Sequence, residues 1–420
     1  MSQDTTPPSP RIAALQHEIV VEGSSAIERF WTEIGRVGAP LIEPLDHRRR
    51  LVTFVWRGAD VRNVLLVSGL TGFDFGANLL TRLPGSDVWY RTIEAPSDVR
   101  TTYRLAPNDP LTLPAQVSDW EERTHGWLPD PLNPAVHHAV QYTDRGNDVP
   151  APASVLELPD AAPQPWVAPR PNTPAGETEL LSFRSATLGN ERRVWLYTPA
   201  GYDPTAGPYP LLVLFDGFAY THTIPTPTIL DNLIAAGRIP PLVAVMPDSV
   251  SRAARDAELT CNPLFTDVLA DELLPWAGAH RSITTDPSLT IVAGSSYGGL
   301  ASAYAAMRRP EVFGAVLSQS GSYWWKPALD DEPEQLIREY EKAPRLPVRY
   351  YLDVGLLEDH SVRGGPSPVQ SNRRMRDVLH SKGYDVHYAE YSGGHDTVCW
   401  QGTLADGLIA LLGPGTRERL

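Results

Sequence analysis

The sequence predicts two domains, a β-sandwich followed by an α/β domain with a mostly parallel sheet and helices on both faces. Three observations support this prediction. The chain has 420 residues, whereas a single core stops growing near roughly 250–300 residues. A proline-rich segment divides the chain near its middle. Short strand-like runs precede this segment, and strands that alternate with helices follow it.

Residues 1–148 form the predicted N-terminal domain. An amphipathic segment at residues 26–38 opens it and is predicted to be helical. The following runs are rich in β-branched and aromatic residues, and Gly, Pro, Asn and Asp separate them at the spacing of a β-sandwich. These predicted strands lie at residues 50–58, 63–69, 86–95 and 100–107.

Residues 149–176 form the predicted linker. Prolines occupy positions 150, 152, 159, 163, 165, 169, 171 and 174. Proline lacks the backbone N–H that helices and central strands use, so this density argues against both.

Residues 177–420 form the predicted α/β domain. Continuous apolar runs that alternate with helices are typical of a parallel sheet covered on both faces. The predicted strands lie at residues 192–202, 209–217, 240–249, 288–296, 314–321, 348–355 and 385–394. The clearest helical patterns lie at residues 262–278, 297–310, 371–383 and 404–413.

Composition excludes several classes of protein. The net charge of −14 has the wrong sign for binding nucleic acid through its phosphates. Two cysteines, Cys261 and Cys399, are too few for a disulfide framework or a zinc site, and His222 stands alone. We therefore expect no metal site and no cofactor.

The chain shows no signal for export or membrane insertion. Its N-terminal stretch lacks a basic segment followed by an apolar run, and no stretch approaches the ~20 apolar residues that span a bilayer. We expect a cytoplasmic protein with no membrane partner.

The strongest chemical signal is Gly-Ser-Ser-Tyr-Gly at residues 294–298. It directly follows an apolar strand and opens a helix, which is the context of a nucleophile elbow in the α/β-hydrolase fold. We predict Ser296 as the nucleophile, although the same pattern also occurs in simple Gly/Ser turns.

A serine nucleophile needs a histidine base and an acid that orients this histidine. In α/β-hydrolases the acid follows the serine along the chain, and the histidine follows the acid. His395 lies in a glycine-containing loop after the last predicted strand, and we predict it as the base; the alternative is a surface histidine. Two adjacent carboxylates, Glu358 and Asp359, follow the strand at residues 348–355. Glu358 is the predicted acid, Asp359 is its rival, and either of them is otherwise a solvated loop residue.

Acyl transfer also requires N–H donors for the oxyanion. The residue after the nucleophile supplies one, here Tyr297. The turn after the strand at residues 209–217 places the N–H of Phe218 as the predicted second donor.

Beyond these residues, the chain resembles the enterochelin (enterobactin) esterase family in both halves. The matching motifs in the C-terminal half are LLVLFDG (211–217), RDAELTCN (255–262), GSSYGGLAS (294–302), SQSGSYWW (318–325) and GGHDTVCW (393–400). Those in the N-terminal half are FW (30–31), VWRG (55–58), RLPGSDVWYR (82–91) and DPLNP (130–134). The resemblance covers nearly the whole chain.

The resemblance implies hydrolysis of the ester bonds of a trilactone catecholate siderophore, usually as its iron complex, inside the cell. Iron would then enter only as part of the substrate. An anionic, aromatic ligand calls for Arg together with aromatic faces. The residues that the resemblance implies for substrate binding are Arg255, Glu258, Asn262, Tyr323, Trp324 and Trp325.

Ordinary structural roles compete with these assignments. Aromatic pairs usually pack in cores, and an Arg near Glu258 can form a structural ion pair. In the N-terminal half, the glycine-containing segment at residues 69–76 is either a wall of the substrate pocket or a plain turn.

Two other functions remain open from the sequence. The α/β domain also resembles feruloyl and other carbohydrate esterases, although such enzymes usually need export. The third possibility is a siderophore-binding protein without catalytic activity on a hydrolase scaffold.

Overall fold

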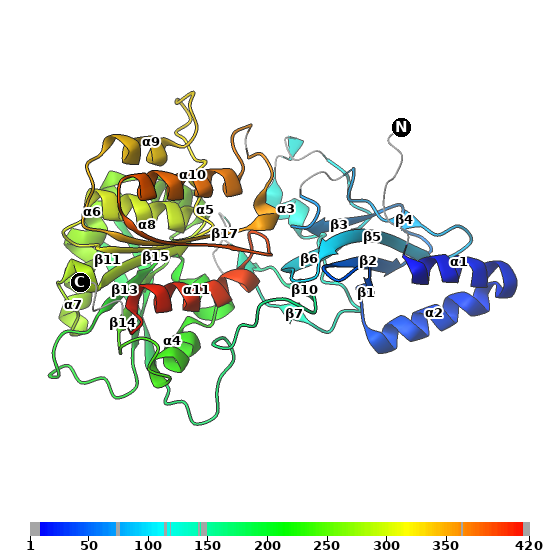
Figure 1. The fold of residues 1–420 in the computed structure, drawn as a ribbon, viewed down its shortest axis with the longest axis horizontal. Helices are drawn as coiled ribbons and strands as arrows, with labels where there is room; N and C mark the ends of the chain where they lie inside the picture. Colours follow the sequence, from blue (N-terminus) through cyan, green and yellow to red (C-terminus); the bar gives the residue numbers. More distant parts are fainter. Residues whose placement is uncertain are drawn as a thin grey trace. The chain divides into compact units, whose positions relative to one another are not determined.

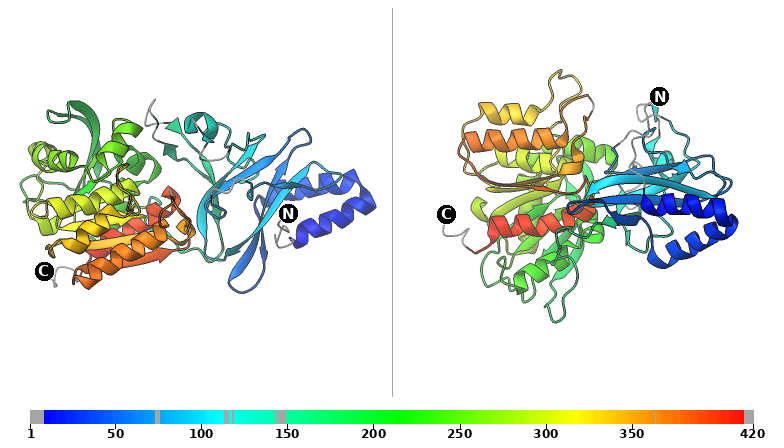
Figure 2. Two further views of the ribbon diagram at one scale, coloured as in Figure 1. Left: turned by 90° about the horizontal axis from the view of Figure 1, so that it is seen from above. Right: turned by 45° about the vertical axis from the view of Figure 1, so that its right-hand side comes forward.

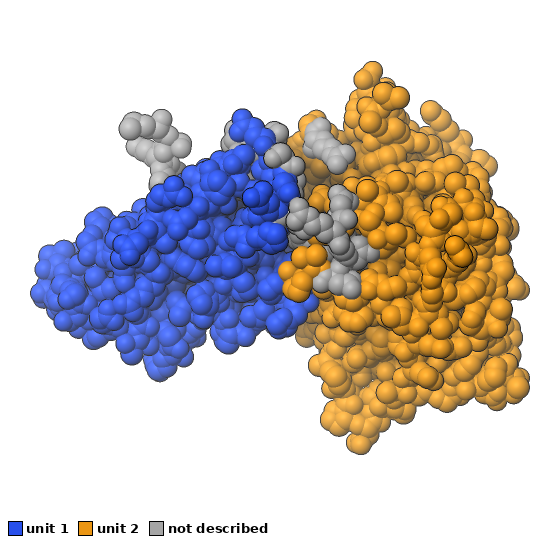
Figure 3. Space-filling model, turned by 180° about the vertical axis from the view of Figure 1, so that it is seen from behind, with its two compact units in different colours: residues 1–139, 151–162, 392–398 blue, residues 140–150, 163–391, 399–420 orange. Residues whose placement is uncertain are grey.

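The computed structural model describes residues 9–72, 76–112, 116–117, 119–141, 143, 149–362 and 364–414. It divides into two compact units (Figure 3). The first comprises residues 1–139, 151–162 and 392–398, and the second comprises residues 140–150, 163–391 and 399–420. None of the helices in the described ranges is long and apolar enough to cross a bilayer.

The first unit is a β-sandwich, as predicted, with two helices before it (Figure 1). One four-stranded sheet has the order β1-β2-β5-β4 and the other has the order β3-β6-β10-β7. Phe54 and Tyr103, one from each sheet, contact edge to face with their ring centroids 4.8 Å apart. The strands of the first sheet are β1 (Leu41–Pro44), β2 (Arg49–Arg57), β4 (Thr81–Arg82) and β5 (Val88–Pro96). Those of the second are β3 (Val64–Ser68), β6 (Arg100–Pro107), β7 (Val136–His137) and β10 (Ala153–Glu157).

Helices α1 (Pro10–Glu22) and α2 (Ser24–Val37) pack on the first sheet. The sequence predicted α2 and missed α1. Its start is nevertheless marked, because Ser9 accepts a hydrogen bond from the N–H of Ile12 (3.2 Å) and a proline takes the first helical position. A short helix, α3 (Trp120–Thr124), follows later.

The predicted linker at residues 149–176 is wrong in its first part. Strand β10 lies inside it and pairs with both β6 and β7, so it is a central strand. The segment Ala153–Glu157 contains no proline, and Pro152 and Pro159 flank it. The gap of six residues between these two prolines is long enough for the five-residue strand, although the proline density of the whole segment is high. Residues 149–150 form β9, which pairs with β8 (Val140–Gln141).

The second unit is built on an eight-stranded sheet with the order β11-β12-β14-β13-β15-β16-β17-β18. The first two strands run antiparallel to their neighbours, and the remaining pairs are parallel. The mixed sheet confirms the predicted α/β-hydrolase class. Its strands are β11 (Glu177–Ser185), β12 (Asn190–Thr198), β13 (Leu211–Leu214), β14 (Val243–Pro247), β15 (Thr290–Ser295), β16 (Ala315–Gln319), β17 (Arg349–Gly355) and β18 (Asp385–Tyr391). The sequence missed only β11, which is an edge strand with mostly exposed side chains.

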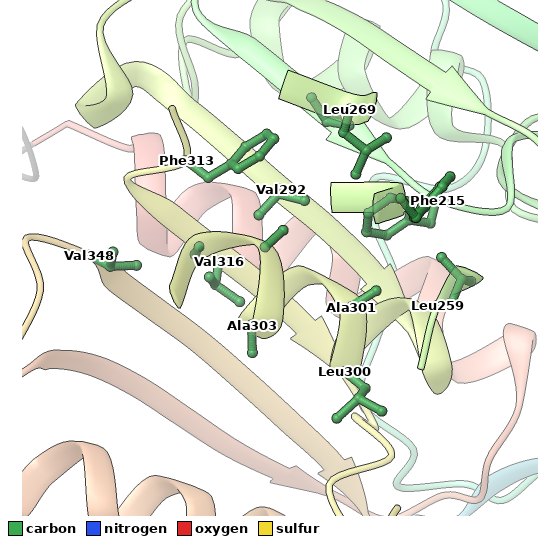
Figure 4. Close-up of a cluster of buried hydrophobic side chains, with 14 of the residues drawn as sticks. Phe215, Leu259, Leu269, Val292, Leu300, Ala301, Ala303, Phe313, Val316 and Val348 are labelled. Atoms are coloured by element: carbon green, nitrogen blue, oxygen red, sulfur yellow. The ribbon is translucent and has the colours of Figure 1, made fainter. Parts of the chain in front are cut away.

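Helices cover both faces of this sheet (Figures 1 and 2). Alternate residues of one strand point to opposite faces, so Leu211 and Val213 of β13 belong to one core and Leu212 and Leu214 to the other. Figure 4 shows part of the first core, with side chains from β15, β16 and α8. Helices α6 (Pro263–Val268), α7 (Leu274–His280), α8 (Tyr297–Arg308), α9 (Gln335–Lys342) and α10 (Pro368–Ser381) supply this core, and α4 (Thr226–Ala235) and α11 (Thr397–Leu412) supply the second. Helix α5 (Arg252–Glu258) precedes α6 in the chain.

Candidate active site

Ser296 lies at the turn between β15 and α8, where the sequence predicted an elbow. Its backbone has φ +58° and ψ −121°, a strained conformation for a residue with a Cβ atom. The turn is tight, because a Cβ atom on Gly294 would come within 2.8 Å of the carbonyl carbon of Gly298. A Cβ atom on Gly299 would come within 2.5 Å of Ser318 Oγ, so the helix packs directly on β16.

The last residue of β16 and the segment that follows it fix the elbow. The N–H of Ser296 donates to the carbonyl of Gln319 (2.9 Å), and its own carbonyl accepts from the N–H of Ser322 (3.0 Å). The hydroxyls of Ser296 and Ser322 lie 3.3 Å apart, and Ser296 is only partly buried. The nucleophile is thus held by its backbone, while its side chain remains accessible.

Glu358 ends a short 3₁₀ turn, η5 (Leu356–Glu358), directly after β17. Its side chain is buried, and Oε1 accepts hydrogen bonds from the hydroxyl of Ser320 (2.6 Å) and from the N–H of Gly355 (2.9 Å). Asp359 is exposed, and its carboxylate accepts from the hydroxyl of Ser367, the N-cap of α10 (2.7 Å). The structure therefore gives the rival acid a surface role and gives Glu358 a fixed, buried position.

A buried network surrounds the Ser320 hydroxyl that holds Glu358. This hydroxyl also accepts from the indole N–H of Trp400 (3.1 Å) and lies 3.0 Å from the hydroxyl of Tyr391. Burial, and then the negative charge of Glu358, hold the pKa of Tyr391 well above its usual value, so its phenol stays neutral.

Asp353 lies beneath this network in β17 and is completely buried. Burial raises the pKa of its carboxyl to about 8. Since the unfolded chain has the ordinary value of about 4, the unfolded state releases this proton first as the pH rises. Asp353 therefore contributes stability that is present below about pH 4 and is lost as the pH rises toward 8.

We expect Asp353→Asn, which cannot ionise, to flatten this part of the pH dependence. The melting temperature of the variant should fall less between pH 5 and pH 8 than that of the wild type. Thermal denaturation at several pH values checks this. Parallel curves for the two proteins would show that the carboxyl keeps the same charge when the protein unfolds.

His395 is exposed and lies in residues 392–398, here named the histidine loop. The loop joins β18 to α11, as the sequence predicted. Although both of these elements are assigned to the second unit for most of their length, the loop itself belongs to the first unit.

The two predicted oxyanion donors differ in their environment. The N–H of Tyr297 is at the first position of α8, where backbone N–H groups have no acceptor within the helix. The N–H of Phe218 instead points to a carboxylate oxygen of Asp248 at 3.4 Å. This N–H therefore has an acceptor within the protein, and Phe218 as the second donor stays a prediction.

Arg255 lies beside the elbow. Its guanidinium binds Asp216 in a bidentate pair (2.7 and 2.8 Å), and it sits 5.8 Å from the ring centroid of Tyr297. Asp216 follows β13 with φ +58° and is buried. The ring of Trp324 is 6.0 Å from that of Tyr297. One guanidinium and two aromatic rings are thus gathered next to the nucleophile.

Three residues that the resemblance implied for substrate binding make structural contacts, and their contact with substrate stays a prediction. Glu258 is buried in a bidentate ion pair with Arg192 (2.7 and 2.9 Å). Asn262 caps α6 by accepting from the N–H of Phe265 (3.1 Å). Tyr323 is fully buried in the first core, and its hydroxyl donates to Ser318 (2.9 Å). Trp325 is partly exposed and packs on the same core.

Sequence reasoning missed Ser320, Ser322 and Asp216. Ser320 has φ +46°, and with Ser322 it belongs to the serine-rich motif that follows β16. A run of small polar residues at the carboxyl end of a central strand was the available signal. Among the residues that the structure describes, no group of three or more His, Cys, Asp and Glu is placed to hold a metal ion.

Comparisons with known proteins match both halves of the chain. Residues 185–411 match the family model described as "Putative esterase", and residues 51–167 match the model described as "Enterochelin esterase, N-terminal". An iron(III) enterobactin esterase of Dickeya dadantii is 33% identical, over 92% of this chain and 93% of its own. An iron(III) salmochelin esterase of Escherichia coli is 30% identical, over 96% of this chain and 98% of its own.

Solved structures agree with these relatives. The enterobactin esterase of Shigella flexneri, determined in the presence of enterobactin, has a TM-score of 0.73 and 29% identity, over 91% of this chain and 97% of its own. The ferric enterobactin esterase of Salmonella typhimurium has a TM-score of 0.76 and 29% identity, over 91% of this chain and 98% of its own.

Proposed function

Because this chain belongs to the enterochelin (enterobactin) esterase family, we propose that Ser296, His395 and Glu358 are the catalytic triad with which it cleaves its substrate. The protein is a carboxylic ester hydrolase that acts on a trilactone catecholate siderophore of the enterobactin type. We propose the ferric complex as its substrate, in which the iron is cargo.

The observation that carries the triad is the strained elbow at Ser296, with φ +58° between a buried strand and a helix. In the proposed reaction, His395 takes the hydroxyl proton as Oγ attacks an ester carbonyl, and the N–H of Tyr297 stabilises the oxyanion. The serine hydroxyl of the siderophore leaves with that proton. Water then releases the acyl group from Ser296 in the same way.

The cluster around Arg255 supports an anionic, aromatic substrate. Asp216 holds the guanidinium in place, while the rings of Tyr297 and Trp324 offer faces for catechol stacking. Three catecholates around one ferric ion carry excess negative charge, which an Arg side chain favours.

A test of this cluster must keep Asp216 from being left buried without its partner, which would destabilise the fold. The test therefore combines Arg255→Gln with Asp216→Asn, so that no unpaired charge stays buried, and uses Asp216→Asn alone as control. The KM for the ferric complex should rise about tenfold, because a charge contact to the substrate is lost, and kcat should change little. The KM for the iron-free form, which carries less charge, should change less.

Steady-state kinetics with both forms of the siderophore measure this difference. An equal rise in KM for both forms would show that Arg255 contributes packing and no charge recognition.

The feruloyl esterase alternative is not favoured. A xylanase/feruloyl esterase of Xylanibacter ruminicola is 29% identical over only 42% of this chain, whereas the enterobactin esterases match nearly all of it. The direct experiment incubates the purified protein with ferric and iron-free trilactone siderophores and with a feruloyl ester. Linear siderophore fragments are the expected products, and cleavage of the feruloyl ester alone would reverse the conclusion.

A further inference from the structure

The histidine loop, residues 392–398, makes its described contacts with the β-sandwich of the first unit. The N–H of Arg100, at the start of β6, donates to the carbonyl of Ser392 (2.9 Å). Arg100 and Gly393 also form an isolated parallel bridge. The backbone comes close again at Gly69, where a Cβ atom would lie 3.7 Å from Cα of Gly394. Phe73, Asp74 and Phe75, in the rest of the segment that begins at Gly69, lie outside the described residues.

Asp396, the residue after His395, accepts three hydrogen bonds through its carboxylate. Its Oδ2 accepts from both the N–H (2.7 Å) and the hydroxyl (2.6 Å) of Thr102 in β6. Its Oδ1 accepts from the N–H of Val398 (3.1 Å) at the start of α11. Hydrogen bonds to a carboxylate are the stronger kind, and here one carboxylate joins β6 to the beginning of the helix.

A second contact fixes the far side of the loop. His137 of β7 lies 2.7 Å from the hydroxyl of Thr397. Burial lowers the pKa of His137, which favours its neutral form. The loop is therefore bonded to the sandwich on both sides of position 395, through Ser392 before it and through Asp396 and Thr397 after it.

These contacts hold the loop that contains His395, the proposed general base. Gly393 and Gly394 give the backbone before His395 conformational freedom, and the imidazole itself is exposed. A general base acts well only when it is held within about 0.5 Å of its productive position. The bonds from β6 restrain this glycine-containing backbone on both sides of His395.

We propose that Thr102 and Asp396 are positioning residues for His395, so that β6 of the N-terminal domain contributes to the rate of ester hydrolysis. This inference rests on the proposed function, in which His395 is the general base. It gives the β-sandwich a part in catalysis that is separate from any contact with substrate.

The test compares full-length variants in steady-state hydrolysis of the iron-free siderophore. Thr102→Val removes the hydroxyl and keeps the side-chain shape, whereas Thr102→Ser restores the hydroxyl. We expect Thr102→Val to lower kcat about 3–10-fold and Asp396→Ala to lower it about 10–100-fold, each with KM within about twofold. Thr102→Ser should recover most of the wild-type kcat. The double variant should be no slower than Asp396→Ala, because both changes break one interaction.

Thr53→Val is the matched control for stability. The hydroxyl of Thr53 lies 2.9 Å from that of Thr92 in the same sandwich, away from the histidine loop. The substitution to Val therefore also removes one hydroxyl from a hydrogen bond. It should lower the melting temperature about as much as Thr102→Val and leave kcat unchanged.

Three outcomes would overturn the inference. An unchanged kcat in Thr102→Val and Asp396→Ala, while His395→Ala is inactive, would refute the positioning role and leave the triad intact. A rise in KM at constant kcat would assign the pair to substrate binding. Activity in His395→Ala would show that His395 is not the general base, which would also contradict the proposed triad.

Discussion

Ser296→Ala should lower kcat for siderophore hydrolysis by about 10⁴-fold or more and leave the fold intact. Loss of the nucleophile removes the covalent pathway, and only binding and the oxyanion donors remain. Ala and Ser both carry a Cβ atom, so the strained backbone at φ +58° is no worse in the variant. The hydroxyl is also not part of the buried core, because Ser296 is partly exposed. Single-turnover and steady-state assays with the ferric siderophore measure the loss.

Ser302→Ala provides a matched control in the same helix. Ser302 is completely buried in α8, and its hydroxyl donates to the carbonyl of Gly298 (2.7 Å), one turn earlier. This change should alter stability slightly and keep wild-type turnover. If Ser296→Ala retained more than about a tenth of the wild-type kcat, Ser296 would not be the nucleophile. Binding of the intact siderophore to the inactive variant, in contrast, is expected.

The elbow was predictable because its signal is local. A buried strand, a glycine at each tight position and a helix are all encoded within about a dozen residues, and each has a steric reason. The structure bears this out at Gly294, where any Cβ atom would meet the backbone of Gly298. The positions of strands β12 to β18 followed from the same kind of local pattern, since continuous apolar runs need a sheet that is covered on both faces.

Partners from distant parts of the chain were not predictable. The sequence placed Arg255 and Glu258 in one motif and suggested a possible ion pair there. In the structure, Arg255 pairs with Asp216 and Glu258 pairs with Arg192, and both partners come from other parts of the chain. A sequence motif shows which residues are neighbours in the chain. It does not show whether a charged side chain binds a ligand or pairs with another side chain.

The predicted boundary between the two domains was a single point in the chain. The first unit, in contrast, also includes residues 151–162 and 392–398, which lie beyond that boundary. Both segments pair with β6, at Arg100 and in the following residues. Contacts between residues almost 300 positions apart, such as Thr102 and Asp396, leave no local pattern in the sequence.

The choice between Glu358 and Asp359 rests on the direction of hydrogen bonds. Two donors, the Ser320 hydroxyl and the Gly355 N–H, both point to Oε1 of Glu358. In Glu358→Gln the amide oxygen must keep that position, because the amide nitrogen cannot accept these bonds. The NH₂ group then takes the place of Oε2, which we propose as the acceptor for the imidazole of His395.

An amide donor facing the imidazole selects the wrong tautomer, with the proton on the nitrogen that should accept it from Ser296. We therefore expect Glu358→Gln to lower kcat by about 10²–10⁴-fold, with little change in KM. Asp359→Asn should change kcat less than about threefold, since its amide oxygen can still accept from Ser367 at the start of α10. Turnover at saturating siderophore, with melting temperatures for both variants, distinguishes the two acids. A large loss confined to Asp359→Asn would mean that the buried carboxylate serves only the fold and that the exposed one orients the base.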